Sequence, residues 1–406
     1  MTGKLPIATR AAGLARLQTV LPRLGRAYAA GRNHDHGPGR PQAVSGLSPW
    51  IRRRLVTEEE VVRAAVAAHG GAADKFVEEV IWRGYFKGWL ERRPQVWTSY
   101  LRGRDADLER LDSDGALQAR VAAAEAGRTG LACFDAFAQE LVATGMLHNH
   151  ARMWFASLWI FTLGLPWRLG ADFFLRHLLD GDPASNTLGW RWVAGLHTRG
   201  KVYAATASNI AQYSAGRFAP RPEDIVIPAQ GLEAEEPEGL PSLRPLRVLI
   251  APRRDVPSLW LITEEDCGLT DFDSDGFTWR GAATLAASQL RSPRPVAEQV
   301  AAFEAAALRD GTTRIGLTAA ALKAVDPAAL VACAQDAGAT QIVTAEVPQG
   351  PLRDWLDAAA PALAAAGLTL AEWRRPWDAT LWPFATAGFF KVRERIPRLL
   401  ADMGID

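Results

Sequence analysis

The spacing of apolar residues changes once along the chain, at a segment rich in proline and glutamate. Before that segment, apolar residues recur every three or four positions, as in "TEEEVVRAAVAAHG" and "ADKFVEEVIWRGYFKGWLERRP", and this spacing predicts amphipathic helices. Thr57, which precedes three glutamates, is a typical helix N-cap. The segment itself, "PRPEDIVIPAQGLEAEEPEGLPSLRP" from Pro220 to Pro245, has the composition of a linker.

After the linker, short apolar runs alternate with Ala-rich helical segments. The predicted strands are "LRVLIA", "SLWLIT", "TRIGLT", "TQIVTA" and "LTLAEW", and the helices between them include "PVAEQVAAFEAAALRD", "DPAALVACAQDAG" and "GPLRDWLDAAAPALAAAG". This alternation favours a parallel sheet covered by helices. We therefore predict an α + α/β chain, with a helical domain over residues 1–218, a linker over 219–245 and a smaller α/β domain over 246–406.

Length and composition limit the class of protein. A chain of 406 residues with 48% hydrophobic residues can bury a large core. The longest apolar runs, such as Met153 to Leu165, are too short for a bilayer, so no membrane association is expected. The basic N-terminal stretch "MTGKLPIATRAAGLARLQTVLPRLGRAYAA" is similar to a transit peptide, but we interpret it as a first helix.

Cysteine, histidine and charge give further expectations. The three cysteines fit buried thiols in a reducing compartment, and the composition indicates a bacterial cytoplasmic protein. The histidines are scattered, so no metal site is predicted, and "HDH" at 34–36 is interpreted as a loop. Residues 1–218 hold 28 Lys and Arg against 19 Asp and Glu, which leaves net charges of +9 there and −8 in the remainder. That excess favours a polyanionic partner, although ordinary solvated helix faces give the same count.

Four clusters in the helical part combine polar side chains with tryptophan or arginine. They are "VSGLSPWIRRRLVT", "EEVIWRGYF", "GMLHNHARMW" and "DGDPASNTLGWRWVAGLHTRGKVY". The first holds hydroxyls beside three consecutive arginines, a combination suited to binding phosphate. A polar concavity rich in tryptophan suits a planar aromatic ligand and a stacked base. Each cluster alone is also explained by capped helix ends and core aromatics.

Taken in order, these motifs resemble a known family. Tyr28 followed by "VSGLSP", "EEVIWRGYFKGWLERRP", "GMLHNHARMW" and "PWRLGADFFLRHLLDGDPASNTLGWRWVAG" resembles the FAD-binding helical domain of the DNA photolyase/cryptochrome family. The resemblance covers roughly residues 10–218. The family usually carries an α/β antenna domain before the helical domain, whereas here an α/β segment follows it, so the order resembles a circular permutation. An unrelated α/β appendage is the alternative.

The resemblance implies FAD as the cofactor and assigns roles to individual positions. Positions that bind the cofactor match Tyr28, Ser45, Leu47, Ser48 and Arg83. The ion pair beside the flavin ring matches Arg152 and Asp180, a ring-facing acid matches Asp182, and the residue opposite flavin N5 matches Asn186. An amide at that last position can hydrogen-bond N5, which favours the electron-donating state of the flavin. A second, antenna chromophore is left open.

The resemblance also implies a pocket for a base flipped out of DNA. Its lining matches Glu79, Trp82, Asn149, His150, Met153 and Trp192. Asn186 and Glu79 are assigned to catalysis, together with Trp190 and Trp167, which match the inner members of an electron-carrying tryptophan chain. The third, surface member of that chain is not evident, and Trp97 or Trp159 is a candidate substitute. His150 stands where repair enzymes commonly have an arginine for DNA phosphate, and Gly84 where they commonly have an acid.

The expected function is light-driven, FAD-dependent repair of cyclobutane pyrimidine dimers in DNA, a photolyase-type lyase activity with damaged DNA as the partner. The alternative is a cryptochrome-like blue-light photoreceptor without repair activity, which would bind a protein partner. A flavoprotein of this fold with neither activity, retained for redox chemistry, is the third.

Overall fold

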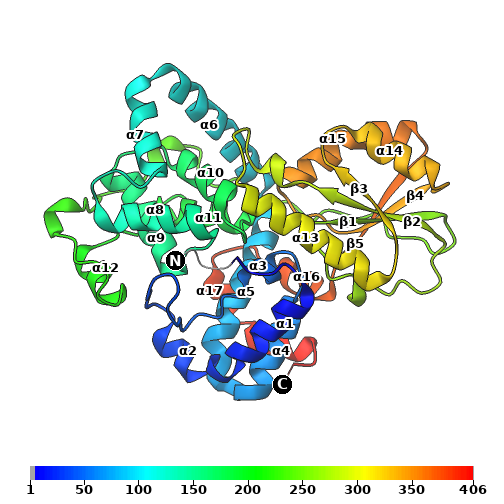
Figure 1. The fold of residues 1–406 in the computed structure, drawn as a ribbon, viewed down its shortest axis with the longest axis horizontal. Helices are drawn as coiled ribbons and strands as arrows, with labels where there is room; N and C mark the ends of the chain where they lie inside the picture. The colour runs from blue at the N-terminus through cyan, green and yellow to red at the C-terminus, as the bar shows by residue number, and fades with distance from the viewer. Residues whose placement is uncertain (1–4, 406) are drawn as a thin grey trace. The chain divides into compact units, whose positions relative to one another are not determined.

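The computed structural model describes residues 5–405, which form two compact units (Figure 1). Unit 1 contains residues 23–45 and 93–243, together with the N-terminal residues up to Leu5. Unit 2 contains residues 6–22, 46–92 and 244–406. The units are therefore interleaved along the chain, and helical residues 46–92 belong to the same unit as the α/β segment. The domain limits predicted at 218 and 246 stay a prediction.

Unit 1 is helical throughout. Its α-helices are α2 (Arg26–Gly31), α6 (Pro94–Ser113), α7 (Gly115–Glu125), α8 (Ala132–Thr144), α9 (Asn149–Ser157), α10 (Trp167–His177), α11 (Pro183–Val193) and α12 (Ala207–Tyr213). A π-helical turn, Leu158–Thr162, follows α9. The apolar run from 131 to 163 does not form one helix, because Gly145 ends α8 in the left-handed conformation (φ 65°).

The predicted linker is packed against unit 1 rather than extended as a free spacer. It contains two short 3₁₀ turns, Pro222–Asp224 and Glu233–Glu235. The carboxylate of Glu236 is buried and accepts two hydrogen bonds from the guanidinium of Arg191 in α11. The composition predicted a linker because the proportions of amino acids do not reveal a buried ion pair such as that of Arg191 with Glu236.

Unit 2 contains a five-stranded parallel sheet with the strand order β3-β2-β1-β4-β5. Its strands are β1 (Ser258–Thr263), β2 (Trp279–Ala286), β3 (Ala319–Lys323), β4 (Gln341–Ala345) and β5 (Thr369–Trp373). The predicted fold class, helices plus a smaller parallel α/β part, is confirmed. Strands β1, β4 and β5 coincide with "SLWLIT", "TQIVTA" and "LTLAEW".

Two predicted strands were wrong. The first half of "TRIGLT" lies in α13 (Glu298–Ile315), which ends at the left-handed Gly316, and β3 follows in "AAALK". "LRVLIA" is irregular chain that runs beside β5, where the Ile250 carbonyl accepts a hydrogen bond from the Glu372 amide at 2.9 Å. Val248 is 93% exposed, so this run has no second layer to cover it.

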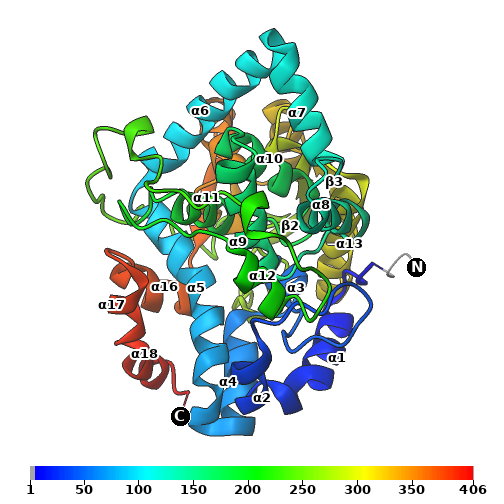
Figure 2. The same cartoon turned by 90° about the vertical axis from the view of Figure 1, so that its left-hand side faces the viewer.

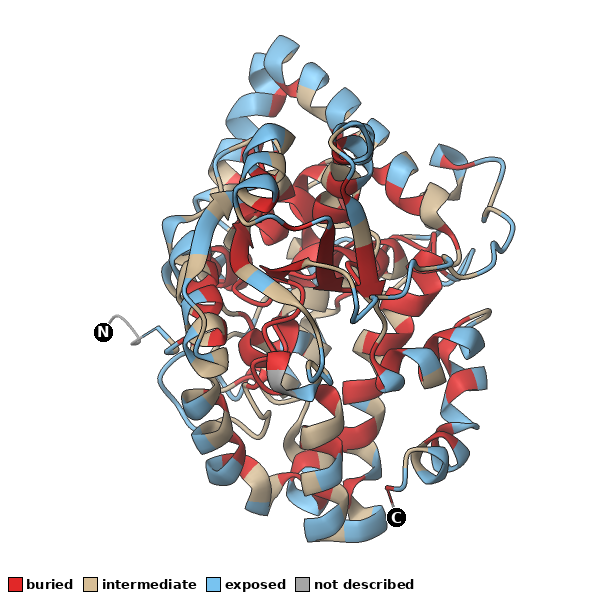
Figure 3. Cartoon of the chain, turned by 90° about the vertical axis from the view of Figure 1, so that its right-hand side faces the viewer, coloured by how far each residue is buried: buried red, intermediate tan, exposed pale blue. Residues whose placement is uncertain are grey.

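Helices cover both faces of the sheet, as Figure 1 shows. Besides α13, these are α14 (Pro327–Asp336) and α15 (Pro351–Ala365). Right-handed crossovers place α13 on one face and α14 with α15 on the other, because the chain reverses its direction across the sheet between β3 and β4. The central strands are buried (Figure 3), with core side chains such as Leu259, Leu261 and Ile342.

The rest of unit 2 is helical. Its other helices are α1 (Arg10–Val20), α3 (Ser48–Arg52), α4 (Glu58–His69), α5 (Asp74–Glu91), α16 (Pro376–Leu381), α17 (Phe389–Arg393) and α18 (Ile396–Asp402). The predicted cap of α4 is confirmed as a capping box between Thr57 and Glu60. N-terminal residues 1–4 of the predicted first helix lie outside the described residues, and α1 begins only at Arg10.

The C-terminal segment packs along α5, as Figures 1 and 2 both show. The packing depends on two small residues one turn apart, Gly84 and Gly88. A methyl group built on Gly84 would lie 2.5 Å from Leu381 Cδ2, and one on Gly88 would lie 2.8 Å from Trp382 Cδ1 and 2.9 Å from its Cα. Both positions therefore exclude a side chain.

Within residues 5–405, no helix is long and apolar enough to span a bilayer.

We expect Gly88→Ala to destabilise the protein, because the added methyl group overlaps the Trp382 ring and backbone. Overpacking of this kind costs about 1–3 kcal/mol, against about 1 kcal/mol gained in helix propensity. The measurement is the free energy of unfolding in urea. Gly71→Ala is the matched control, since its methyl group meets no atom within 4 Å, and equal stability of the two variants would contradict the packing argument.

Candidate cofactor and substrate site

The predicted site residues are divided between the two units. Unit 1 contains Tyr28, Ser45, Asn149, His150, Arg152, Met153, Trp167, Asp180, Asp182, Asn186, Trp190 and Trp192. Unit 2 contains Leu47, Ser48, Glu79, Trp82 and Arg83. In unit 1 most of them lie on α9 and α11 or in the turn that precedes α11.

An ion pair links α9 to the turn before α11. Arg152 Nη2 donates to both carboxylate oxygens of Asp180, at 3.0 and 2.9 Å, and its Nε donates to the Leu147 carbonyl at 2.9 Å. The Asp180 side chain is 2% exposed and that of Arg152 is 24% exposed. The pair predicted from the sequence is therefore formed, and the remaining guanidinium nitrogen is available to a ligand.

Asp182 and Asn186 are oriented by the start of α11. Asp182 is the N-cap, and its Oδ1 accepts from the Ser185 amide at 2.8 Å. Asn186 Nδ2 donates to the Ala171 carbonyl at 2.8 Å. Because a carbonyl can only accept, this bond assigns the orientation of the amide, and Asn186 Oδ1 is the atom left as an acceptor.

The first turn of α9 depends on a neutral histidine. His148 is the N-cap, and its Nδ1 accepts from the His150 amide at 3.1 Å. Burial, opposed by Asp35 and aided by the nearby His150 and Arg152, lowers the pKa of His148 to about 4. The unprotonated Nδ1 that the cap requires is thus the stable form at neutral pH.

His150 is held by the protein itself. Its Nδ1 lies 3.0 Å from the Asn33 carbonyl, and its ring stacks on Trp154 at a centroid distance of 4.5 Å. Burial lowers the pKa of His150 as well. The imidazole is therefore a weak substitute for the arginine that repair enzymes commonly place there.

The other predicted pocket residues of unit 1 reach the surface to different degrees. Asn149 is exposed, whereas Met153 and Trp192 are half-buried. Trp192 stacks on Tyr203 at a centroid distance of 5.3 Å and an interplanar angle of 29°. Tyr203 was not predicted; it follows a Gly-Lys turn that gives no motif in the sequence.

In unit 2, α5 carries the other predicted lining residues. Glu79 is exposed, while Trp82 and Arg83 are half-buried. Arg83 Nη1 is buried without a hydrogen-bond partner among residues 5–405, as expected of a donor that serves an anion. Gly84 lacks the acid common in repair enzymes because Leu381 occupies that space.

The arginines after Ser48 do not bind phosphate in this structure. Arg52 donates to Glu265 at 2.8 and 2.6 Å, Arg53 to Glu264 at 3.3 Å and Arg54 to Asp266 at 3.3 Å. All three arginines are at most 4% exposed. Of this motif, Ser45 and Ser48 remain half-buried and Leu47 is buried, and Tyr28 in α2 is 7% exposed.

Aromatic rings continue beyond the two predicted electron carriers. The Trp190 ring lies edge-on to Phe174 at 5.2 Å and fills the space beside Gly170 in α10. Trp167, at the start of α10, lies 5.8 Å from Tyr100, which lies 5.3 Å from Trp97. Trp97 is 1% exposed and Trp159 is 0% exposed, so neither candidate for the third member is a surface residue.

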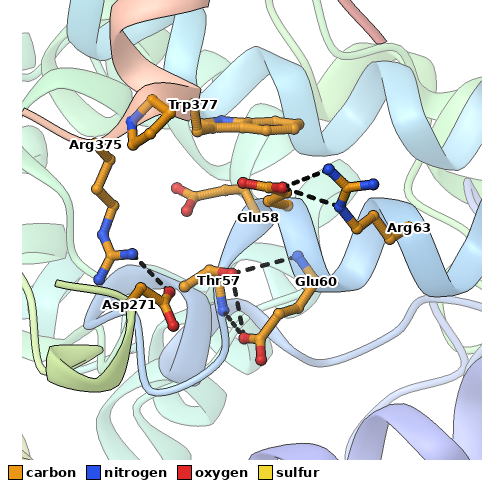
Figure 4. Close-up of a pocket in the computed structure, with 9 residues that line it drawn as sticks. Thr57, Glu58, Glu60, Arg63, Asp271, Arg375 and Trp377 are labelled. Carbon is orange, nitrogen blue, oxygen red and sulfur yellow. Dashed lines mark hydrogen bonds and ion pairs between the residues drawn. The ribbon is translucent and has the colours of Figure 1, made fainter. Parts of the chain in front are cut away.

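A separate cavity of about 330 Å³ lies within unit 2 (Figure 4). It is lined by Thr57, Glu58, Glu59, Glu60, Arg63, Asp271, Arg375, Pro376 and Trp377. Its charges are already compensated: Arg63 pairs with Glu59 at 2.8 Å, and Arg375 pairs with Asp271 at 2.7 Å. Figure 4 shows the pair of Arg375 with Asp271, and we assign no ligand to this cavity.

The donor set of the predicted cofactor residues fits FAD. Within unit 1, the buried carboxylate of Asp180 is paired with Arg152, and Asn186 has an oriented amide oxygen. An N–H donor such as that of reduced flavin N5 complements the Asn186 oxygen. Within residues 5–405, no group of three His, Cys, Asp or Glu side chains is arranged to hold a metal ion.

Comparisons with known proteins agree with these motifs. Residues 76–218 match the family described as the FAD binding domain of DNA photolyase. The chain is 39% identical over 166 residues to the deoxyribodipyrimidine photo-lyase of Streptomyces griseus, across 41% of this chain and 34% of that protein. It is 31% identical over 170 residues to that of Escherichia coli, across 40% and 33%. The chain thus spans about a third of the length of these relatives.

Among solved structures, the Synechocystis cryptochrome matches with 24% identity and a TM-score of 0.39, over 50% of this chain and 43% of that one.

We expect His148→Asn to flatten the dependence of stability on acid pH. Because the folded-state pKa of His148 lies below the ordinary value of 6.5, the unfolded chain takes up the proton first, and stability is lost as pH falls from about 6.5 to about 4. Asparagine caps a helix without titrating. Urea unfolding from pH 7 to pH 4 should show the variant losing up to about 3 kcal/mol less than wild type. Parallel profiles would contradict the assignment.

Proposed function

We propose that this chain, whose residues 76–218 match the FAD binding domain of DNA photolyase, is a light-driven, FAD-dependent lyase that splits cyclobutane pyrimidine dimers in DNA. The observation that carries the proposal is the joint presence of the flavin set and the lesion set. The departures are His150 and Gly84, which stand where repair enzymes commonly have an arginine and an acid, and the missing third tryptophan. We further propose damaged DNA as the partner and the cytoplasm as the location.

The bound FAD would supply one chemistry, the donation of an electron from its light-excited reduced form to the lesion. The protein's own residues bind and orient. The Arg152–Asp180 pair places a cation and an anion beside each other, and both side chains are mostly shielded from solvent. Such a pair can hold a charged ring system in one orientation. Asn186 presents an acceptor oxygen whose direction is fixed by the Ala171 carbonyl.

The lesion residues differ in what they contribute. Trp82 and Trp192 are half-buried, so each has ring surface available for stacking on a base. Glu79 and Asn149 are exposed, and a carboxyl and an amide suit the pyrimidine edges. Hydrogen bonds from these groups would also stabilise the negative charge that the lesion takes up before its bonds break.

The second candidate is a blue-light photoreceptor of the same family, and specific contacts favour it. His150 is stacked on Trp154 and bonded to the Asn33 carbonyl, so it is a poor phosphate ligand. Gly84 packs against Leu381, so no polar side chain stands in for the acid at that position. Each lost phosphate contact weakens DNA binding without affecting FAD.

We propose that the α/β part is a permuted antenna-type domain that supports the helical part. In doubly wound sheets, ligands bind at the carboxyl ends of the strands where the strand order reverses, here between β1 and β4. The residues after β1 are Glu264, Glu265 and Asp266, and arginines of the same unit bind all three. We infer that these paired carboxylates are not available to bind a chromophore at that place.

The decisive experiment is repair of an oligonucleotide that carries one cyclobutane thymine dimer, with purified, chemically reduced, FAD-loaded protein in blue light and in the dark. We expect repair in light only. Absence of repair by FAD-loaded protein would transfer the assignment to the photoreceptor, for which a light-dependent change in partner binding or oligomeric state is then required.

In the same assay, we expect Trp192→Ala to reduce repair at subsaturating DNA by about tenfold or more, because loss of one base-stacking ring costs about 1–3 kcal/mol. FAD content should be unchanged. Trp355→Ala is the matched control, since Trp355 is also half-buried and lies on α15, outside the predicted site. Equal repair by both variants would reject the role given to Trp192.

We expect Asp180→Asn to weaken FAD retention, because it leaves Arg152 without its buried counter-charge while preserving side-chain size. The dissociation constant for FAD, measured by recovery of flavin fluorescence, should rise by about tenfold or more. Asp105→Asn serves as the control: Asp105 also pairs with an arginine in unit 1, at 2.7 Å, but is 55% exposed. Unchanged retention in Asp180→Asn would contradict the cofactor assignment.

A further inference from the structure

The ring of Trp82 in α5 is stacked face to face on Phe389, the first residue of α17. Their centroids lie 3.7 Å apart and their planes differ by 14°. Tyr85, also in α5, meets the same phenylalanine edge-on at 5.4 Å and 74°. No other ring pair of α5 is both so close and so nearly parallel among the described aromatic contacts. The contact joins parts of unit 2 that are far apart in the sequence.

The position of Phe389 is determined by the packing of the C-terminal segment along α5. The Tyr85 hydroxyl donates a hydrogen bond to the Ala387 carbonyl at 2.7 Å, two residues before the ring. Upstream, Leu381 and Trp382 fill the spaces beside Gly84 and Gly88. Phe389 is therefore held by the chain on its N-terminal side as well as by its own ring contacts.

Exposure differs between the two stacked rings. Phe389 is 4% exposed, whereas Trp82 is half-buried. The phenylalanine thus covers one face of the indole, and Trp82 keeps surface that solvent or a ligand can reach. The next residue, Phe390, is 66% exposed and takes no part in the stack. Phe389 and Phe390 are therefore two adjacent phenylalanines, of which the first is buried and the second is exposed.

We propose that Phe389 is a positioning residue for nucleobase stacking on Trp82. The inference rests on the proposed function, in which Trp82 stacks on the flipped-out lesion. An indole that rotates freely loses side-chain entropy when a base binds, whereas one already fixed against a second ring does not. The parallel Phe389 ring holds the indole plane in one orientation, so that less side-chain entropy is lost when the lesion binds.

The stacking of Phe389 on Trp82 also links the C-terminal segment to the proposed substrate site. The C-terminal segment "RRPWDATLWPFATAGFFKVRERIP", residues 374–397, resembles the end of an antenna domain in sequence. The structure assigns one of them to the back of the lesion-stacking tryptophan. A wall of the substrate site is then completed by the segment that follows the sheet.

The test compares Phe389→Leu, which keeps an apolar side chain but removes the ring, with Phe389→Tyr, which restores a ring. Phe390→Leu is the matched control on the same helix. For each full-length, FAD-loaded protein, the dissociation constants are measured for an oligonucleotide with one thymine dimer and for the same undamaged sequence. Flavin absorbance and the urea midpoint establish that each variant is folded and loaded.

We expect Phe389→Leu to reduce the preference for damaged over undamaged DNA by about fivefold, while Phe389→Tyr and Phe390→Leu keep it. Binding to undamaged DNA and its salt dependence should not change, since these report phosphate contacts. A purely structural role would instead weaken both oligonucleotides or lower FAD content.

As a second readout, proteins labelled with 5-fluorotryptophan should show the Trp82 fluorine resonance, identified with Trp82→Phe, shifted in Phe389→Leu but not in Phe390→Leu.

Two results would overturn the inference, and they are distinguishable. If wild type prefers the dimer and Phe389→Leu keeps that preference within twofold, Phe389 does not position Trp82 for binding, and the proposed function stands. If wild type shows no preference for the dimer, the proposed function fails and the inference fails with it. If Phe389→Leu does not fold, Phe389→Tyr decides. Because this variant retains a ring, it must keep both the wild-type preference for the dimer and the wild-type fluorine resonance of Trp82.

Discussion

Three consecutive arginines facing three consecutive acids determine how the sheet joins the helices of unit 2. Arg52, the last residue of α3, and the following Arg53 and Arg54 pair with Glu265, Glu264 and Asp266 directly after β1. The pairing is reinforced by a backbone hydrogen bond of 2.8 Å from the Cys267 amide to the Arg53 carbonyl. Because these charges are buried, loss of one partner would leave an uncompensated ion at a cost of about 3–5 kcal/mol. A shift in the pairing of the arginines with the acids would leave all three pairs uncompensated.

This array also determines what the sheet can bind. Its carboxylates occupy the strand ends where a doubly wound fold otherwise receives a ligand, and the guanidinium of Arg375 binds Asp266 from the other side at 2.5 and 2.7 Å. Burial opposes the ionisation of Glu264, but Arg291, Arg52 and Arg53 lower its pKa to about 2, so this carboxylate stays ionised at neutral pH. Because these carboxylates are paired with arginines, we propose the α/β part as a support for the helical part rather than as a second ligand site.

Much of the fold follows from sequence because local signals agree with it, as at the Thr57 cap and at β1, β4 and β5. Strands β2 and β3 were not predicted, since "WRGAATLA" and "AAALK" are rich in alanine, which has low β propensity. The site residues were predicted from motifs that carry chemistry, and their roles stay predictions. The partners of Arg52–Arg54 were not, because a guanidinium binds phosphate and carboxylate with the same geometry, and the contact of Phe389 with Trp82 depends on packing that no local pattern records.

The contact between α5 and the C-terminal segment has a consequence for the order of assembly. A ribosome releases α5 long before residues 376–402, so the small-residue face of α5 and the Trp82 ring stay uncovered while the whole of the sheet is made. Contacts of such long sequence separation form late, because the entropy of closing the loop must be overcome first. Nascent chains of this protein thus expose apolar surface for most of their synthesis, and they are natural clients for chaperones until the last helices emerge.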